Sequence, residues 1–142
     1  GTGRIANISG QGYQHAGKFI SRWLAAVPSI IKDSIKTNFP GTPGGGGSDF
    51  ASFVAVGAPG FSLSSLSWSY SNYTWHTNRD TYDKIIFDDL RSNAIVTAIM
   101  VYMACEDPET LPRDKANLSS GKPIPWPIQV KSLRKGPVVP KK

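Results

Sequence analysis

At 142 residues, 39% of them hydrophobic, the chain is long enough for one domain with a hydrophobic core. Its net charge of +6 does not indicate a nucleic-acid partner, because residues 1–115 carry ten basic and ten acidic side chains and the six further basic side chains all follow Lys115. No run is long and apolar enough to cross a bilayer, and the single Cys105 excludes an intramolecular disulfide and a cysteine-based metal cluster.

The N-terminal part of the chain is predicted to be helical. It starts with Gly1-Thr2-Gly3-Arg4, which is neither a signal peptide nor a natural start, so we expect the chain to begin inside a larger unit. A helix is predicted over residues 13–27, because its apolar residues repeat on one helical face. These residues are Phe19, Ile20, Trp23, Leu24 and Val27. Pro28 either ends this helix or opens a second one that reaches Ile35.

The middle of the chain combines a glycine-rich loop with short strands. Residues 39–47 hold two prolines and a run of four glycines, which is incompatible with regular structure. We interpret this stretch as an active-site loop, with an interdomain linker as the alternative. A short buried strand is predicted over Phe53–Val56, then a turn over residues 57–60, and a second short strand from Phe61. The segment from Ser64 to Asn72 is expected to be irregular.

The most informative stretch is Trp75-His76-Thr77-Asn78-Arg79-Asp80-Thr81. It places an imidazole, a carboxylate four residues later and flanking hydroxyls on one polar loop, which is where α/β enzymes usually carry their chemistry. A carboxylate near an imidazole fixes its tautomer, as it does for many zinc ligands. From spacing alone, His76 is still more simply read as an ordinary loop histidine, because no HExxH, GxSxG or phosphate-binding loop accompanies it. The other histidine, His15, is expected to have a surface or capping role.

A long helix is predicted after this loop, with Asp88 as its N-cap and Asp107-Pro108 at its end. Its expected core face consists of Leu90, Ala94, Ala98, Val101, Tyr102 and Cys105. Cys105 is then a buried structural thiol. From Leu111 onward, repeated prolines indicate an extended and poorly packed chain. The sequence is therefore divided into a folded part, residues 1–115, and a basic, proline-rich tail, residues 116–142.

These motifs also occur together in a known family. The run Gly44–Asp49, followed by Phe53, Gly57–Gly60 and Trp75–Lys84, resembles in order and spacing the C-terminal half of the co-catalytic di-zinc exopeptidases (metallopeptidase family twenty-eight). That family includes bacterial leucyl aminopeptidases and carboxypeptidase Q. The helix end at Glu106-Asp107, with Leu-Pro-Arg after it, is most similar to the carboxypeptidase Q type. The resemblance covers roughly residues 1–115.

The resemblance implies a fold and a set of site residues. The fold is α/β, as the incomplete C-terminal part of a three-layer α/β/α domain with two zinc ions at the carboxyl ends of its strands. His76 matches the last zinc ligand, and Asp80 matches the carboxylate that orients this histidine or anchors its loop. Ser48, Asp49 and Trp75 match positions beside the metal or the substrate.

The implied function is hydrolysis of peptide bonds by a zinc-activated water in a complete aminopeptidase or carboxypeptidase/dipeptidase. The other zinc ligands and the general-base glutamate are expected upstream of Gly1, so no catalytic residue lies in this chain. Alone, the chain is expected to be inactive, to bind zinc weakly and to need the N-terminal half of its own domain. The resemblance also implies a peptide substrate and a periplasmic or secreted location.

Two alternatives stay open. The first is another use of the same fold, either a glutaminyl-cyclase-like acyltransferase or a metal-free binding domain. Trp75 directly before His76 is similar to the glutaminyl cyclases. The second is an adaptor that binds a membrane or nucleic acid through residues 116–142. Salt-dependent binding that disappears when this tail is deleted would reveal such an adaptor.

Overall fold

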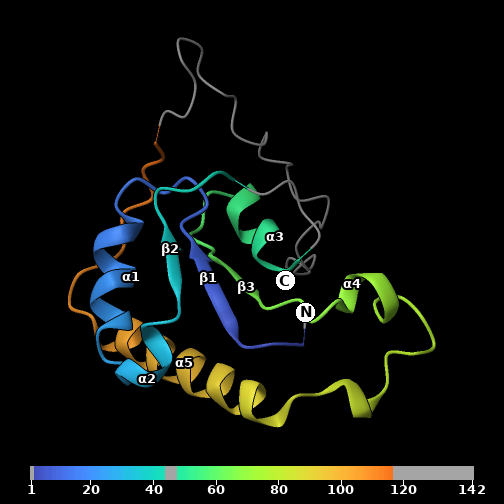
Figure 1. Cartoon of the computed structure of the whole chain (residues 1–142). Helices are drawn as coiled ribbons and strands as arrows, with labels where there is room; N and C mark the ends of the chain where they lie inside the picture. The colour runs from blue at the N-terminus through green and yellow to red at the C-terminus, as the bar shows by residue number, and fades with distance from the viewer. Residues whose placement is uncertain (1, 44–47, 117–142) are drawn as a thin grey trace, which may run out of the picture.

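The computed structural model describes residues 2–43 and 48–116, which form α/β structure (Figure 1). This confirms the fold class expected from the sequence. The strands are β1 (Ile5–Ser9), β2 (Lys36–Asn38) and β3 (Ser62–Ser65). The helices are α1 (Ala16–Leu24), α2 (Ser29–Lys32), α3 (Phe50–Ala55), α4 (Tyr70–Tyr73) and α5 (Phe87–Glu106), with a 3-10 turn η1 (Tyr82–Lys84). Among these residues no helix has the length and apolar character that crossing a membrane requires.

The strands form one mixed sheet in the order β2-β1-β3. The central strand β1 runs parallel to β2 and antiparallel to β3. The sequence did not predict β1, because its buried residues Ile5 and Ile8 are three positions apart and break the period of two. The register with β3 shifts between Ile5 and Asn7, and such a bulge brings residues three apart onto one face.

The core lies between β1, α1 and α5. The predicted apolar face of α1 is confirmed, because Phe19, Ile20, Trp23 and Leu24 are all buried. They pack with Ile5 and Ile8 of β1 and with Val96 and Met100 of α5. Burial of each such side chain contributes about 1.5–3 kcal/mol. Pro28 opens the second helix, as one of the two predictions had it, although α2 is a single turn.

The predicted core face of α5 is wrong. Val96, only 1% exposed, and Met100 face the core, whereas Leu90 (49% exposed) and Tyr102 (64%) face outward. The other predicted core residues, Ala94, Ala98, Val101 and Cys105, are also exposed. Cys105 is therefore not a buried thiol. The helix carries apolar residues on all sides, so its pattern does not indicate which side packs. Its N-cap is Ile86 rather than Asp88, but it ends at Glu106 as predicted.

The predicted strand over Phe53–Val56 is also wrong, because these residues belong to α3 and the turn after it. Only Val54 is buried, while Phe53 and Val56 are exposed. A short apolar run fits either a strand or a short helix, and periodicity cannot separate the two. The second predicted strand is confirmed as β3, while α4 lies in a segment expected to be irregular.

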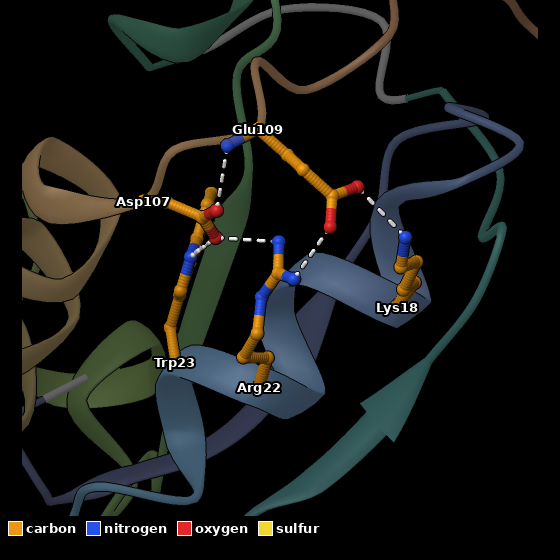
Figure 2. A network of polar contacts seen from close by, with 5 residues as sticks. All are labelled: Lys18, Arg22, Trp23, Asp107 and Glu109. Carbon is orange, nitrogen blue, oxygen red and sulfur yellow. Dashed lines mark hydrogen bonds and ion pairs between the residues drawn. The ribbon is translucent and has the colours of Figure 1, made fainter.

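A polar network joins α1 to the chain that follows α5 (Figure 2). Arg22 bridges two carboxylates, with its Nη2 2.6 Å from Asp107 Oδ2 and its Nη1 2.9 Å from Glu109 Oε1. The indole N–H of Trp23 donates to Asp107 at 2.7 Å, and Lys18 donates to Glu109 at 2.8 Å. These contacts join residues that lie far apart in the sequence, and they hold the end of α5 against α1.

The chain after this network returns to the loop between β1 and α1. The backbone N–H of Ala116 donates to Gly12 at 2.8 Å, and Lys115 forms a bridge with Tyr13. His15 lies at the surface, as expected, and its Nε2 is 3.0 Å from Asp114 Oδ2. The described chain thus stays attached to the folded part up to Ala116. The predicted tail, residues 116–142, otherwise lies outside the described residues, so the domain boundary stays a prediction.

Candidate zinc-ligand loop

The His76 loop follows the carboxyl end of β3. Because β3 is antiparallel to β1, the chain leaves β3 beside the start of β1, where the N–H of Leu66 donates to Arg4 at 2.9 Å. It then forms α4, which lies on the side of the sheet away from α1 (Figure 1). Thr74, which is buried, directly follows α4. The loop from Thr74 to Thr81 therefore extends outward from one buried anchor.

Threonine hydroxyls hold the loop in shape. The Oγ1 of Thr77 donates to the carbonyl of Thr74 at 2.7 Å and accepts from the N–H of Arg79 at 3.1 Å. The Oγ1 of Thr81 donates to the carbonyl of Arg79 at 3.2 Å. Such local bonds between side chain and backbone fix turns that lack regular hydrogen bonding. The turn is therefore ordered although nearly all of it is exposed.

His76 is an exposed side chain on this ordered turn. Its backbone φ of 59° lies in the left-handed region, which is uncommon for residues other than glycine. Its ring stacks on the ring of Trp75, with 4.1 Å between the centroids and 30° between the planes. Among the described residues, neither ring nitrogen of His76 has a hydrogen-bond partner. The imidazole is thus oriented by Trp75 and has both nitrogens available.

Asp80 contacts α4 rather than His76. Its Oδ2 accepts a hydrogen bond from the hydroxyl of Tyr70 at 2.6 Å. This hydrogen bond, together with partial burial, raises the pKa of Tyr70. This contact ties the loop back to α4, and Asp80 can anchor the loop in this way. Tyr70 was not singled out in the sequence, because nothing in the local pattern connects two residues that are ten positions apart.

Ser48 and Asp49 lie near the opposite end of β1 from the His76 loop. They directly precede α3, and both are exposed. The end of α3 is held at the carboxyl end of β1, because the hydroxyl of Tyr13 donates to Ala58 at 2.6 Å. The Nζ of Lys115 donates to the carbonyl of Val54 at 3.4 Å. Burial raises the pKa of Tyr13 and lowers that of Lys115.

The described structure does not bring the predicted site residues together. The His76 loop starts near the amino end of β1 and α3 lies near its carboxyl end, so Asp49 makes no contact with His76. Within residues 2–43 and 48–116, no three His, Cys, Asp or Glu side chains lie close enough to hold a metal ion. A catalytic zinc site needs about three protein ligands. The described residues by themselves therefore do not form a complete zinc site.

Comparison with known proteins assigns the chain to a family. A model of peptidase family M28 matches residues 2–101, a range that runs from β1 into α5 and contains the His76 loop. Members of this family are zinc-dependent peptidases with an α/β fold. No curated protein and no solved structure gives a significant match. Because the matched range spans well over half of the sequence, the chain belongs to peptidase family M28.

Proposed function

We propose that this chain is the C-terminal portion of a zinc-dependent exopeptidase and that His76 supplies the last zinc ligand. One observation carries the assignment: the imidazole is exposed on an ordered loop, is oriented by Trp75 and has both nitrogens unbonded among the described residues. A neutral ring nitrogen is a common zinc ligand. Family membership supplies the chemical context for this ligand.

The residues of this chain have supporting roles in the proposed hydrolysis. When bound, two zinc ions would supply a water of lowered pKa and polarise the scissile carbonyl. His76 presents a ring nitrogen, and Trp75 restricts the rotation of that ring by stacking. Asp80 holds the loop through Tyr70. Ser48 and Asp49 stay a prediction for the loop beside the substrate.

The remaining groups are proposed to come from the N-terminal portion of the same domain. Two observations support this. Among the described residues no three potential metal ligands lie close together, and the outward face of α5 presents a stripe of apolar side chains. We call this set, Leu90, Ala94, Ala98, Val101, Tyr102 and Cys105, the α5 outer face. Exposed apolar patches of this kind usually mark a protein contact. A periplasmic or secreted location stays a prediction.

A glutaminyl-cyclase-like acyltransferase is the second candidate, supported by Trp75 stacked on His76. The two candidates differ in product. A cyclase converts an N-terminal glutamine into a pyroglutamyl ring and releases ammonia, whereas a peptidase consumes water and releases an amino acid. Incubating the complete zinc-loaded protein with a peptide that starts with glutamine, and measuring both products, separates them.

Replacing His76 by alanine in the complete protein tests the proposed ligand. The variant is expected to lose more than about 100-fold of its zinc-dependent dipeptide hydrolysis. Loss of a residue that only supports a metal ligand lowers activity by up to about 100-fold, and loss of the ligand itself should lower it more. Zinc content per protein, measured by elemental analysis, should fall as well. His15→Ala is the matched control, because His15 makes only a surface pair with Asp114. Near-normal turnover of His76→Ala with two bound zinc ions would contradict the assignment.

A further inference from the structure

Arg79 occupies a fixed position on the proposed ligand loop, three residues after His76. Its backbone is held on both sides, by Thr77 Oγ1, which accepts from its N–H at 3.1 Å, and by Thr81 Oγ1, which donates to its carbonyl at 3.2 Å. The backbone N–H of Thr81 also donates to this carbonyl, at 3.0 Å. The side chain itself is exposed. The loop therefore presents a guanidinium from a well-defined starting point.

The acidic neighbours of Arg79 are engaged with other donors. Asp80 accepts from the hydroxyl of Tyr70 at 2.6 Å. Asp83 forms an ion pair with Lys84 and shares the single hydroxyl proton of Thr81 with the Arg79 carbonyl, and these contacts lower the pKa of Asp83. Among the described residues, the guanidinium of Arg79 therefore has no ion-pair or hydrogen-bond partner, although two carboxylates lie within four positions of it in the sequence. Its charge is available to a ligand.

A guanidinium on the same loop as the proposed zinc ligand, three residues after it, favours one class of substrate. Its planar fork of N–H donors matches a carboxylate and can bind it with two parallel hydrogen bonds. A carboxypeptidase or dipeptidase must recognise the free α-carboxylate of its substrate. An aminopeptidase must recognise an ammonium group, which a guanidinium repels. We propose that Arg79 binds the α-carboxylate of the substrate, so that the enzyme prefers peptides with a free C-terminus. This inference rests on the proposed exopeptidase function.

The test uses the complete zinc-loaded protein and three substrates: the dipeptide Leu-Leu, its C-terminal amide, and the C-terminal amide of Leu-Glu. The wild type is expected to prefer Leu-Leu. Arg79→Gln should reduce the ratio of kcat/KM for Leu-Leu to that for its amide by about 10- to 100-fold, as expected for loss of a hydrogen bond between charged groups. The change should appear mainly in KM. Arg79→Lys, which keeps the charge without the fork, should restore part of the ratio.

Arg91→Gln is the matched control. Arg91 is an exposed arginine on α5 with a surface pair to Asp88 at 3.4 Å, and its loss should leave the ratio unchanged. Equal losses of Leu-Leu and Leu-Leu-amide hydrolysis in Arg79→Gln would overturn the inference, as would a loss confined to Leu-Glu-amide. A wild type that hydrolyses none of the three substrates with zinc bound would contradict the exopeptidase function itself. If the wild type hydrolyses Leu-Leu and Arg79→Gln leaves the kcat/KM ratio unchanged, only the role of Arg79 is contradicted.

Discussion

At the scale of single residues, the hydrogen bond between Tyr70 and Asp80 is the side-chain contact that joins the His76 loop to α4. Removing the hydroxyl by Tyr70→Phe is expected to lower kcat/KM of the complete enzyme about fivefold, the effect of one ordinary hydrogen bond. Asp80→Ala should have a similar effect, because both changes remove the same contact. The double variant should be no worse than either single variant, and steady-state kinetics on all four proteins measures this coupling.

Tyr73→Phe serves as the control for this cycle. Tyr73 also belongs to α4, but it is exposed and its hydroxyl makes no hydrogen bond among the described residues. Fully additive losses in the double variant would show that Asp80 acts independently of Tyr70, for example by orienting the ring of His76. The sequence could single out His76 and Asp80 as candidates because both lie in one short motif, and their roles at a metal stay a prediction. Tyr70 could not, because its contact depends on how α4 folds back over the loop.

At the scale of secondary-structure elements, prediction depended on whether hydrophobic periodicity was one-sided. α1 has a single apolar face, so its buried residues were predicted correctly. α5 is apolar on all sides, so its length and end were predicted but its packed face was not. In β1 a bulge disturbs the alternation that identifies a strand. Tertiary packing decides each of these cases, and a local pattern does not contain that information.

The network between α1 and the end of α5 should make stability depend on acid pH. Hydrogen bonds from Lys18 and Arg22 lower the pKa of Glu109. Burial would raise the pKa of Asp107, but the bonds from the Glu109 N–H, Trp23 and Arg22 outweigh it and lower this pKa too. The unfolded chain therefore binds protons at Asp107 and Glu109 more tightly than the folded chain does. The stabilisation that these two carboxylates give the folded state is complete above the ordinary carboxyl pKa of about 4. It is lost as the pH falls through their lowered pKa values in the folded state.

Urea unfolding of the complete protein between pH 7 and pH 3 measures this dependence. The wild type should lose stability below pH 5, and Glu109→Gln should be less stable at pH 7 and lose less on acidification. Asp88→Asn is the control, because it removes an exposed carboxylate at the start of α5 that pairs with Arg91 and has no part in the network. Parallel pH curves for wild type and Glu109→Gln would show that the network does not set the acid limit.

At the scale of the whole molecule, the described residues form a small core, and the α5 outer face leaves apolar side chains exposed. The family resemblance predicted the α/β class, which the structure confirms, while Asp49 and His76 lie towards opposite ends of β1. That separation could not be predicted, because the direction of β3 relative to β1 is not encoded in the motifs themselves. The described residues alone therefore provide too few ligands for a catalytic zinc site, and we propose that the other ligands come from the N-terminal portion of the domain.

The chain produced alone is expected to bind zinc more weakly than micromolar and to aggregate through the α5 outer face. Isothermal titration calorimetry with zinc measures the first property, and light scattering measures the second. Co-production with the N-terminal portion of the domain should give a soluble complex with stoichiometric zinc, because covering the apolar face and completing the ligand set both require that portion. In the chain alone, Leu90→Ser combined with Val101→Ser should reduce aggregation without improving zinc binding. Stoichiometric, submicromolar zinc binding by the chain alone would show that a complete site already exists within these 142 residues.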